Sequence, residues 1–348
     1  MDKLKEMTEK FPTRYWNDSC SIKELTYALE RGATGATTNP IIVRQVLEQD
    51  MDLYKDYVRG LVEEMGTATE DEIAWKVIEK MAAEGAKMLE PIFDPKDGKG
   101  RISIQTNPKY FRSPEKITEQ ARYFATLAPN IQVKAPATAA GIEAFEEMTY
   151  HGVNVNATVS FSYTQAVASA EAIERGLKRR EAEGKDVSEM GPICTIMIGR
   201  LDDWLKRVVE RDNIAIDPRA LEFAGIACVK KAYREFLEKG YRSRILTAAY
   251  RSPLHWTEFI GGDLILTIPY MYQVRFNNSD FEVKPAIDDD VDPYYIDQLM
   301  MLPDFVKAYV KMDVNEFDSY GPVNITLDQF LTGYDELIKI IRKFMLRY

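Results

Sequence analysis

The amino-acid sequence predicts an α/β fold in which a single domain forms a closed (β/α)8 TIM barrel, with helical insertions and a C-terminal helical extension. Three observations support this prediction. Eight short apolar segments alternate with stretches of helix-forming residues, and Gly, Pro and Asn residues separate them. The chain has 348 residues, 45% of them hydrophobic, which fits one barrel with insertions. Polar residues recur at the carboxyl ends of the apolar segments, where such barrels assemble their active sites.

We assign the whole chain, 1–348, to this one domain. The barrel core is expected over about 12–275 and the extension over about 280–348, ending in a helix from Leu327 that packs on the barrel. The apolar segments predict strands at 14–18, 33–39, 101–106, 131 to just before Pro136, 153–158, 192–200, 244–249 and 263–268.

The first two strands each end in a polar residue. Ser21 and Glu24 have the spacing of a capping box and are expected to begin a helix, so Asp18 is not needed as the cap. The Asp18 carboxylate is therefore free either for function or for stabilising the turn. Asn39 precedes Pro40, which suits the first helical position, so Asn39 is either a functional residue or simply an N-cap.

Lys134 stands near the end of the predicted fourth strand. Its neighbours along the strand are small and apolar, and none is a carboxylate. Such a desolvated setting lowers the pKa of an amine and makes it a nucleophile toward a carbonyl carbon. The alternative is an ordinary solvated or ion-paired lysine. We interpret Lys134 as a Schiff-base lysine.

Five further polar residues fall at or near predicted strand ends: Gln105, Asn156, Thr158, Arg200 and Arg251. Asparagine is a poor strand former, so its amide needs partners on the face it occupies, and an interior polar site would supply them. Neutral amide and hydroxyl groups suit the hydroxyls of a sugar, and forked guanidinium donors suit an anionic head group such as phosphate. One shared pocket explains this recurrence better than independent accidents do.

Charge and composition exclude several classes of partner. The net charge of −10 argues against nucleic acid or an anionic membrane, because either requires a positive surface. The N-terminal residues are charged and no run of about 18 apolar residues occurs, so we expect neither a signal peptide nor a membrane span, and a cytoplasmic location.

Cysteine and histidine are too few for a disulfide framework or a metal site. Cys20, Cys194 and Cys228 are widely separated, which predicts reduced thiols. We expect both histidines, His151 and His255, to be surface residues. Zinc sites usually draw on more imidazoles or on cysteine pairs, so we expect no metal and no cofactor.

At four separated stretches, 32–40, 133–141, 152–162 and 260–269, the sequence resembles the transaldolase family. The resemblance implies a class I aldolase-type barrel of the pentose phosphate pathway that needs no cofactor. It implies transfer of a dihydroxyacetone unit from a ketose phosphate, fructose 6-phosphate or sedoheptulose 7-phosphate, to an aldose phosphate such as erythrose 4-phosphate. It also suggests a homodimer.

The matching motifs imply catalytic roles for four residues. Lys134 would form the Schiff base and Asp18 would be the general acid and base. Thr158 would hold the catalytic water, and Gln105 stands where the family carries a glutamate that works through that water.

Five residues would bind substrate. Asn39 and Asn156 would hold the ketose, and Thr195 occupies the place of a serine near its hydroxyls. Arg200 and Arg251 would bind the phosphate.

Three departures from the family pattern keep alternatives open. A glutamine at 105 cannot exchange a proton at neutral pH. Met197 stands where an aromatic residue is common, and Ala249 replaces a serine that helps to bind phosphate. A related aldolase subgroup has the glutamine and releases free dihydroxyacetone. The arginines would also accept a sulfonated sugar such as sulfofructose, and a catalytically silent binding barrel is a further alternative.

Overall fold

In the computed structural model, which describes residues 2–346, eight parallel strands close into a barrel in which each strand pairs with the next along the chain and β8 pairs with β1. The predicted (β/α)8 barrel is confirmed. The strands are β1 (Arg14–Asn17), β2 (Gly35–Thr37), β3 (Arg101–Gln105), β4 (Ile131–Pro136), β5 (Val155–Thr158), β6 (Ile193–Met197), β7 (Arg244–Ala248) and β8 (Ile265–Ile268).

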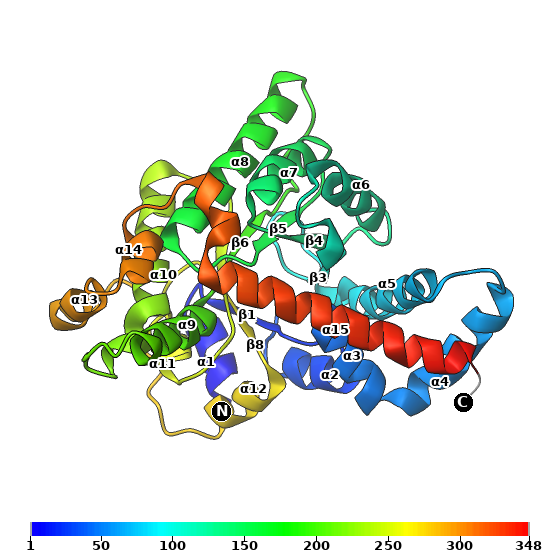
Figure 1. The fold of residues 1–348 in the computed structure, drawn as a ribbon, viewed down its shortest axis with the longest axis horizontal. Coiled ribbons are helices and arrows are strands. Elements are labelled where there is room, and N and C mark those ends of the chain that lie inside the picture. Colours follow the sequence, from blue (N-terminus) through cyan, green and yellow to red (C-terminus); the bar gives the residue numbers. More distant parts are fainter. Residues whose placement is uncertain (1, 347–348) are drawn as a thin grey trace.

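Helices surround the barrel (Figure 1). Helix α1 (Lys3–Lys10) precedes the first strand. Those between or just after the strands are α2 (Ile22–Glu30), α3 (Pro40–Gln49), α4 (Met51–Glu64), α5 (Glu70–Leu89), α6 (Pro114–Phe124), α7 (Ala139–Tyr150), α8 (Tyr163–Ala182), α9 (Ile198–Arg211), α10 (Ala224–Lys239), α11 (Leu254–Thr257) and α12 (Tyr270–Asn277). The C-terminal ones are α13 (Pro293–Leu299), α14 (Pro303–Tyr309) and α15 (Gly321–Met345). Short 3-10 helices cover 90–92, 108–110, 220–223 and 314–319. No described helix is long and apolar enough to cross a membrane.

Alternation along the strands decides which side chains reach the barrel interior. In β3, Ile102 is directed outward, where it lies against Gly85 of α5. Ser103, the next residue, faces inward and accepts a hydrogen bond from Asn156 Nδ2 at 3.0 Å. The strand register pairs Gln105 with Lys134 and Lys134 with Asn156, so the three polar residues share one level of the barrel wall.

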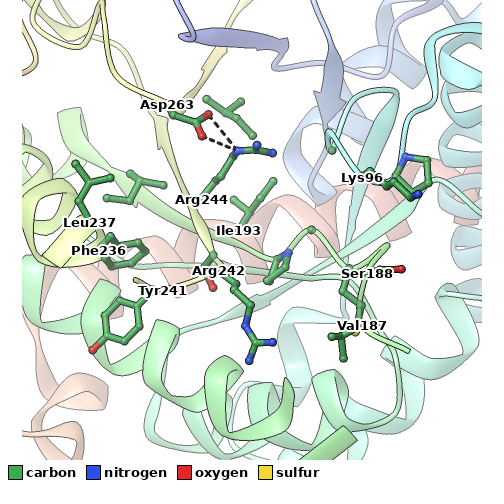
Figure 2. A pocket seen from close by; sticks show the side chains of 18 of the residues that line it. Lys96, Val187, Ser188, Ile193, Phe236, Leu237, Tyr241, Arg242, Arg244 and Asp263 are labelled. Carbon is green, nitrogen blue, oxygen red and sulfur yellow. Dashed lines mark hydrogen bonds and ion pairs between the residues drawn. The ribbon is translucent and has the colours of Figure 1, made fainter. Parts of the chain in front are cut away.

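Charged residues occupy the opposite, amino-terminal end of the barrel. Arg14 pairs with Asp97, and Arg244 Nε pairs with Asp263 Oδ1 at 3.1 Å. Figure 2 shows the Arg244–Asp263 pair in a cavity of about 450 Å3 at this end. The starts of β6, β7 and β8 line that cavity, so it lies at the other end of the strands from the predicted catalytic residues.

The long helix α15 runs across the molecule in Figure 1 and contacts α3, α4, α5 and α9. It begins at Gly321, six residues before the expected start at Leu327. Its packing on α3 is close, since a Cβ placed on Gly333 would lie 2.5 Å from Ile41 Cγ1.

Three local predictions were wrong. Ser21 occupies the N-cap position of α2, but its hydroxyl makes no capping hydrogen bond because it donates to Asp50 Oδ2 at 3.1 Å instead. The fourth strand was expected to end just before Pro136, but Pro136 is the last residue of β4. A proline is tolerated at a strand end because it removes only one backbone N–H donor from the sheet. Arg200 does not end a strand: β6 stops at Met197, and Arg200 lies in the first turn of α9. The chain enters α9 without a loop.

Close packing inside the barrel gives a direct test of the fold. Gly35 faces Trp16, and an added Cβ would lie 2.4 Å from the indole ring and 2.7 Å from the Arg101 carbonyl oxygen. Gly35→Ala should therefore lower the free energy of unfolding by about 1–3 kcal/mol in denaturant titration. Gly60, on α4, has no atom within 4 Å of such a Cβ, so Gly60→Ala should raise it by about 0.5–1 kcal/mol. Equal effects of the two substitutions would contradict this packing.

Candidate active site

Lys134 is buried inside the barrel, with 6% of its surface exposed. Burial lowers the pKa of its amine; the Asp18 carboxylate opposes this shift and Arg200 adds to it. Within residues 2–346, Nζ has no hydrogen-bond partner. An amine that is hard to protonate and has no partner is free to attack a carbonyl carbon.

Asp18 follows β1 and lies close enough to Lys134 for each to change the pKa of the other. Asp18 Oδ1 accepts a hydrogen bond from Thr37 Oγ1 at 2.6 Å, and Thr37 Oγ1 lies 2.6 Å from Thr267 Oγ1. Burial raises the pKa of Asp18, while Lys134, Thr37 and Arg200 oppose the rise. The hydroxyl partner comes from β2 and not from the turn after β1, so this carboxylate is placed to exchange a proton inside the barrel.

Three inward-facing side chains from β6, β5 and β3 form a hydrogen-bonded row across the barrel interior. Thr195 Oγ1 donates to Asn156 Oδ1 at 2.7 Å, and Asn156 donates to Ser103. The expected partners of the Asn156 amide are therefore present. Asn154 lies before β5, where its side chain accepts from Gly191 N at 2.8 Å, so the two asparagines do not share a site.

The two remaining predicted catalytic residues, Gln105 and Thr158, are uncharged, and Thr158 lies two residues beyond Asn156 on β5. Gln105 is 3% exposed, and within the described chain its Oε1 has no hydrogen-bond partner. Thr158 is buried, and its hydroxyl lies 4.0 Å from Met197 Sδ. Neither the Gln105 amide nor the Met197 thioether can exchange a proton at neutral pH, whereas the Thr158 hydroxyl can donate one hydrogen bond and accept others.

Asn39 is the N-cap of α3, as the purely structural of its two interpretations predicts. Its Oδ1 accepts a hydrogen bond from Ile42 N at 3.0 Å, and Pro40 is the first helical residue. The cap uses only the carbonyl side of the amide, so its two N–H donors are left for a ligand.

The two predicted anion-binding arginines line one cavity of about 80 Å3. Arg200 Nη1 donates to Thr326 Oγ1 at 3.3 Å and also bonds Gln329 Oε1, both on α15. Burial and then Arg251 lower the pKa of Arg200 to about 10. A poorly hydrated guanidinium beside a second one favours an anionic ligand.

Arg251 is held from two directions. Its Nε donates to Asp203 Oδ2 at 2.9 Å, and its Nη1 donates to the Tyr250 carbonyl oxygen at 2.8 Å. The side chains of Arg251 and Asp203 are each 40% exposed, so this pair is accessible from solvent.

Sequence reasoning predicted only the two arginines of this cavity and missed its other residues, among them the polar side chains of Asp203, Arg207, Thr326 and Gln329. Asp203 and Arg207 follow Arg200 at a spacing of three and then four residues, so a search for one polar face of α9 would have found them. Thr326 and Gln329 come from α15, and nothing local marks them.

The prediction that both histidines lie at the surface was wrong for His255. His151 is exposed, but His255 is fully buried, with Nε2 2.9 Å from Asp202 Oδ2. The short helix α11 turns this ring inward, where both nitrogens find partners. No metal explains the burial, since residues 2–346 contain no cluster of three or more His, Cys, Asp or Glu suited to one.

The sequence model of the Transaldolase/Fructose-6-phosphate aldolase family matches residues 15–319. The chain belongs to this family. The match contains every site residue predicted from the sequence and ends before Gln329. The description of this family joins two related kinds of protein, transaldolases and fructose-6-phosphate aldolases.

Individual relatives are distant. The chain is 28% identical over 244 residues to "Transaldolase 2" of Streptomyces avermitilis, covering 68% of this chain and 64% of the relative. It is 27% identical over 267 residues to "Transaldolase" of Thiobacillus denitrificans, covering 69% and 72%. It is 30% identical over 216 residues to "Transaldolase" of Neisseria meningitidis serogroup A, covering 61% and 59%. The first and third alignments span less than two thirds of those relatives.

The Thr37 hydrogen bond predicts a shift in pH dependence. Thr37 donates to the Asp18 carboxylate and so lowers its pKa. Thr37→Val removes that donor and so raises the pKa of Asp18 further, which should move the acid limb of the pH profile of kcat/KM to higher pH. Thr267→Val is the matched control, because Thr267 contacts Thr37 and not Asp18. An acid limb that stays in place in Thr37→Val would argue against Asp18 as the base.

Proposed function

We propose that this protein is a transaldolase that moves a dihydroxyacetone unit from a ketose phosphate to an aldose phosphate through a Schiff base on Lys134. The observation that carries the proposal is the buried, unpartnered Lys134 amine beside the Asp18 carboxylate, at the end of the barrel where Arg200 and Arg251 line an anion-sized cavity.

The first half of the reaction joins donor and enzyme. The neutral Lys134 amine adds to the ketose carbonyl carbon, and loss of water with uptake of one proton leaves an iminium; the later hydrolysis of the iminium returns that proton. The Asp18 carboxylate then takes the proton of the C4 hydroxyl as the C3–C4 bond breaks. An aldose phosphate leaves, and the bond's electron pair passes into an enamine on Lys134.

The second half runs the same steps backwards with another aldose. The enamine carbon attacks the new aldehyde, and protonated Asp18 gives its proton to the resulting alkoxide. Water hydrolyses the iminium and frees Lys134. The raised pKa of Asp18 supports this alternation, because a carboxyl group must be both a usable base and a usable acid.

The surrounding groups match the parts of such a sugar. Asn156, Thr195 and the free amide of Asn39 provide neutral hydrogen-bonding groups for hydroxyls. Arg200 and Arg251 provide forked donors for the phosphate. The positive charge of Arg200 also helps to keep Lys134 neutral.

Borohydride trapping tests the proposal. Incubation with fructose 6-phosphate and borohydride, followed by peptide mass mapping, should show a reduced dihydroxyacetone adduct on Lys134. Lys134→Arg should be inactive, because a guanidinium stays protonated and cannot act as the nucleophile. An adduct on another lysine would overturn the assignment. A wild-type protein that is never labelled would favour a binding-only barrel.

Removal of the Arg251 side chain should show how much binding of the phosphate group contributes, apart from the chemistry at the dihydroxyacetone end of the substrate. Arg251→Ala is expected to lower kcat/KM for phosphorylated donors by a factor equivalent to about 2–4 kcal/mol, because the charge-assisted hydrogen bonds from the guanidinium to the phosphate are lost. Trapping of unphosphorylated dihydroxyacetone on Lys134 should change much less. Equal losses on both substrates would indicate a structural role. A sulfonated ketose tested in parallel would show which head group the cavity prefers.

Gln105 decides between transfer and aldol cleavage with release. Release requires protonation of the enamine carbon, whereas transfer requires attack of that carbon on an aldehyde; hydrolysis of the resulting iminium is common to both. An amide cannot exchange a proton with the water that would protonate the enamine. We therefore expect transfer to erythrose 4-phosphate to exceed dihydroxyacetone release from fructose 6-phosphate alone. Gln105→Glu should speed release by about 10²-fold relative to transfer. Wild-type release as fast as transfer would instead assign an aldolase.

A further inference from the structure

Asp202 and His255 form a buried pair behind the arginine cavity, and neither lines it. Their side chains are 1% and 0% exposed. Asp202 Oδ2 lies 2.9 Å from His255 Nε2, and Asp202 Oδ1 accepts a hydrogen bond from Gly225 N at 3.0 Å. Both carboxylate oxygens are thus satisfied, as burial requires.

The other ring nitrogen of His255 holds the main chain of Arg251. Arg251 N donates to His255 Nδ1 at 3.1 Å, so Nδ1 is the unprotonated nitrogen of the ring. Nε2 therefore carries the proton and donates it to Asp202. Because both ring nitrogens make hydrogen bonds, the ring is fixed in one tautomer and one orientation. The Arg251 peptide that binds Nδ1 is fixed in orientation as well.

The main chain held in this way is strained. Ala249, two residues before Arg251, has φ +67°, a left-handed conformation that costs an alanine about 1–2 kcal/mol. Its carbonyl oxygen accepts from Gly199 N at 3.1 Å, and a Cβ on Gly199 would lie only 2.1 Å from that oxygen. Such strain persists only where neighbouring contacts fix the backbone. Gly199 fixes it on one side and His255 on the other.

Residues of α9 therefore position both arginines. Arg200 lies in the first turn of α9, and Asp203 on the same helix binds the Arg251 side chain. Asp202, between them, reaches the Arg251 main chain through His255.

We propose that Asp202 and His255 are positioning residues for anion binding: they fix the Arg251 main chain so that its guanidinium meets the anionic head group together with Arg200. This inference rests on the proposed function for the identity of the substrate. The binding of inorganic phosphate, which tests it, can be measured whether or not the protein has that function. Neither residue touches the reacting atoms.

The test compares His255→Ala, His255→Asn and Asp202→Asn with wild type and with His151→Ala, a control at the exposed histidine. In His255→Asn, the side-chain carbonyl oxygen of the new amide can replace Nδ1 as acceptor. An amide at 202 can turn its N–H toward Nε2, which then moves the ring proton to Nδ1 and removes that acceptor. The dissociation constant of inorganic phosphate is measured by calorimetry, KM is measured for fructose 6-phosphate, and the rate of borohydride trapping is measured with dihydroxyacetone.

In His255→Ala and Asp202→Asn, we expect the phosphate dissociation constant and KM to rise about tenfold, with dihydroxyacetone trapping within about twofold of wild type. His255→Asn should recover part of the loss, and His151→Ala should match wild type. Unchanged phosphate binding, an equal loss in trapping, or unfolding of all three variants would overturn the proposal, as would a wild type that binds no phosphate. A wild type that binds phosphate but gives no Lys134 adduct would refute the proposed function alone, and the phosphate constants would still decide the positioning role.

Discussion

The site depends on the burial of one amine inside a closed barrel. An ammonium ion removed from water loses several kcal/mol of solvation free energy unless a partner compensates for it. Burial therefore favours the neutral form of the Lys134 amine. The parallel register surrounds it with uncharged groups, Gln105 on one neighbouring strand and Asn156 on the other. Asp18 is close enough to interact electrostatically but makes its hydrogen bond to Thr37. The lysine thus keeps a nearby base without a permanent ion pair.

The two ends of the site are built differently and are still electrostatically linked. The strands supply the residues around Lys134, whereas α9 and α15 supply most of the anion cavity. Arg200 connects them, because its charge opposes protonation of Lys134 and also opposes the rise in the pKa of Asp18. An anionic head group bound there would weaken both effects, so occupancy of the cavity would raise the proton affinity of both Lys134 and Asp18.

The residues that sequence reasoning placed correctly are those whose position follows from strand periodicity. Lys134 and Asp18 could be found because parallel strands end at one rim and alternation selects the inward face. Arg200 was misplaced because nothing local distinguishes a strand end from a helix that follows without a loop. His255 and Gln329 were missed or misread because their roles come from contacts with α9, which lies far away along the chain. The pairing of Ser21 with Asp50 overrode a good local capping signal for the same reason.

The amide at 105 has two opposing electrostatic consequences. A carboxylate in register with Lys134 would stabilise the ammonium form and slow formation of the Schiff base, and it would also raise the pKa of Asp18 by like-charge repulsion. The neutral amide avoids both effects but gives water no group with which to exchange a proton. Its Oε1, buried and without a partner among residues 2–346, still accepts one hydrogen bond from a substrate hydroxyl or from water. In the proposed reaction, the neutral amide would therefore favour formation of the Schiff base, and slow protonation by water would lengthen the lifetime of the enamine.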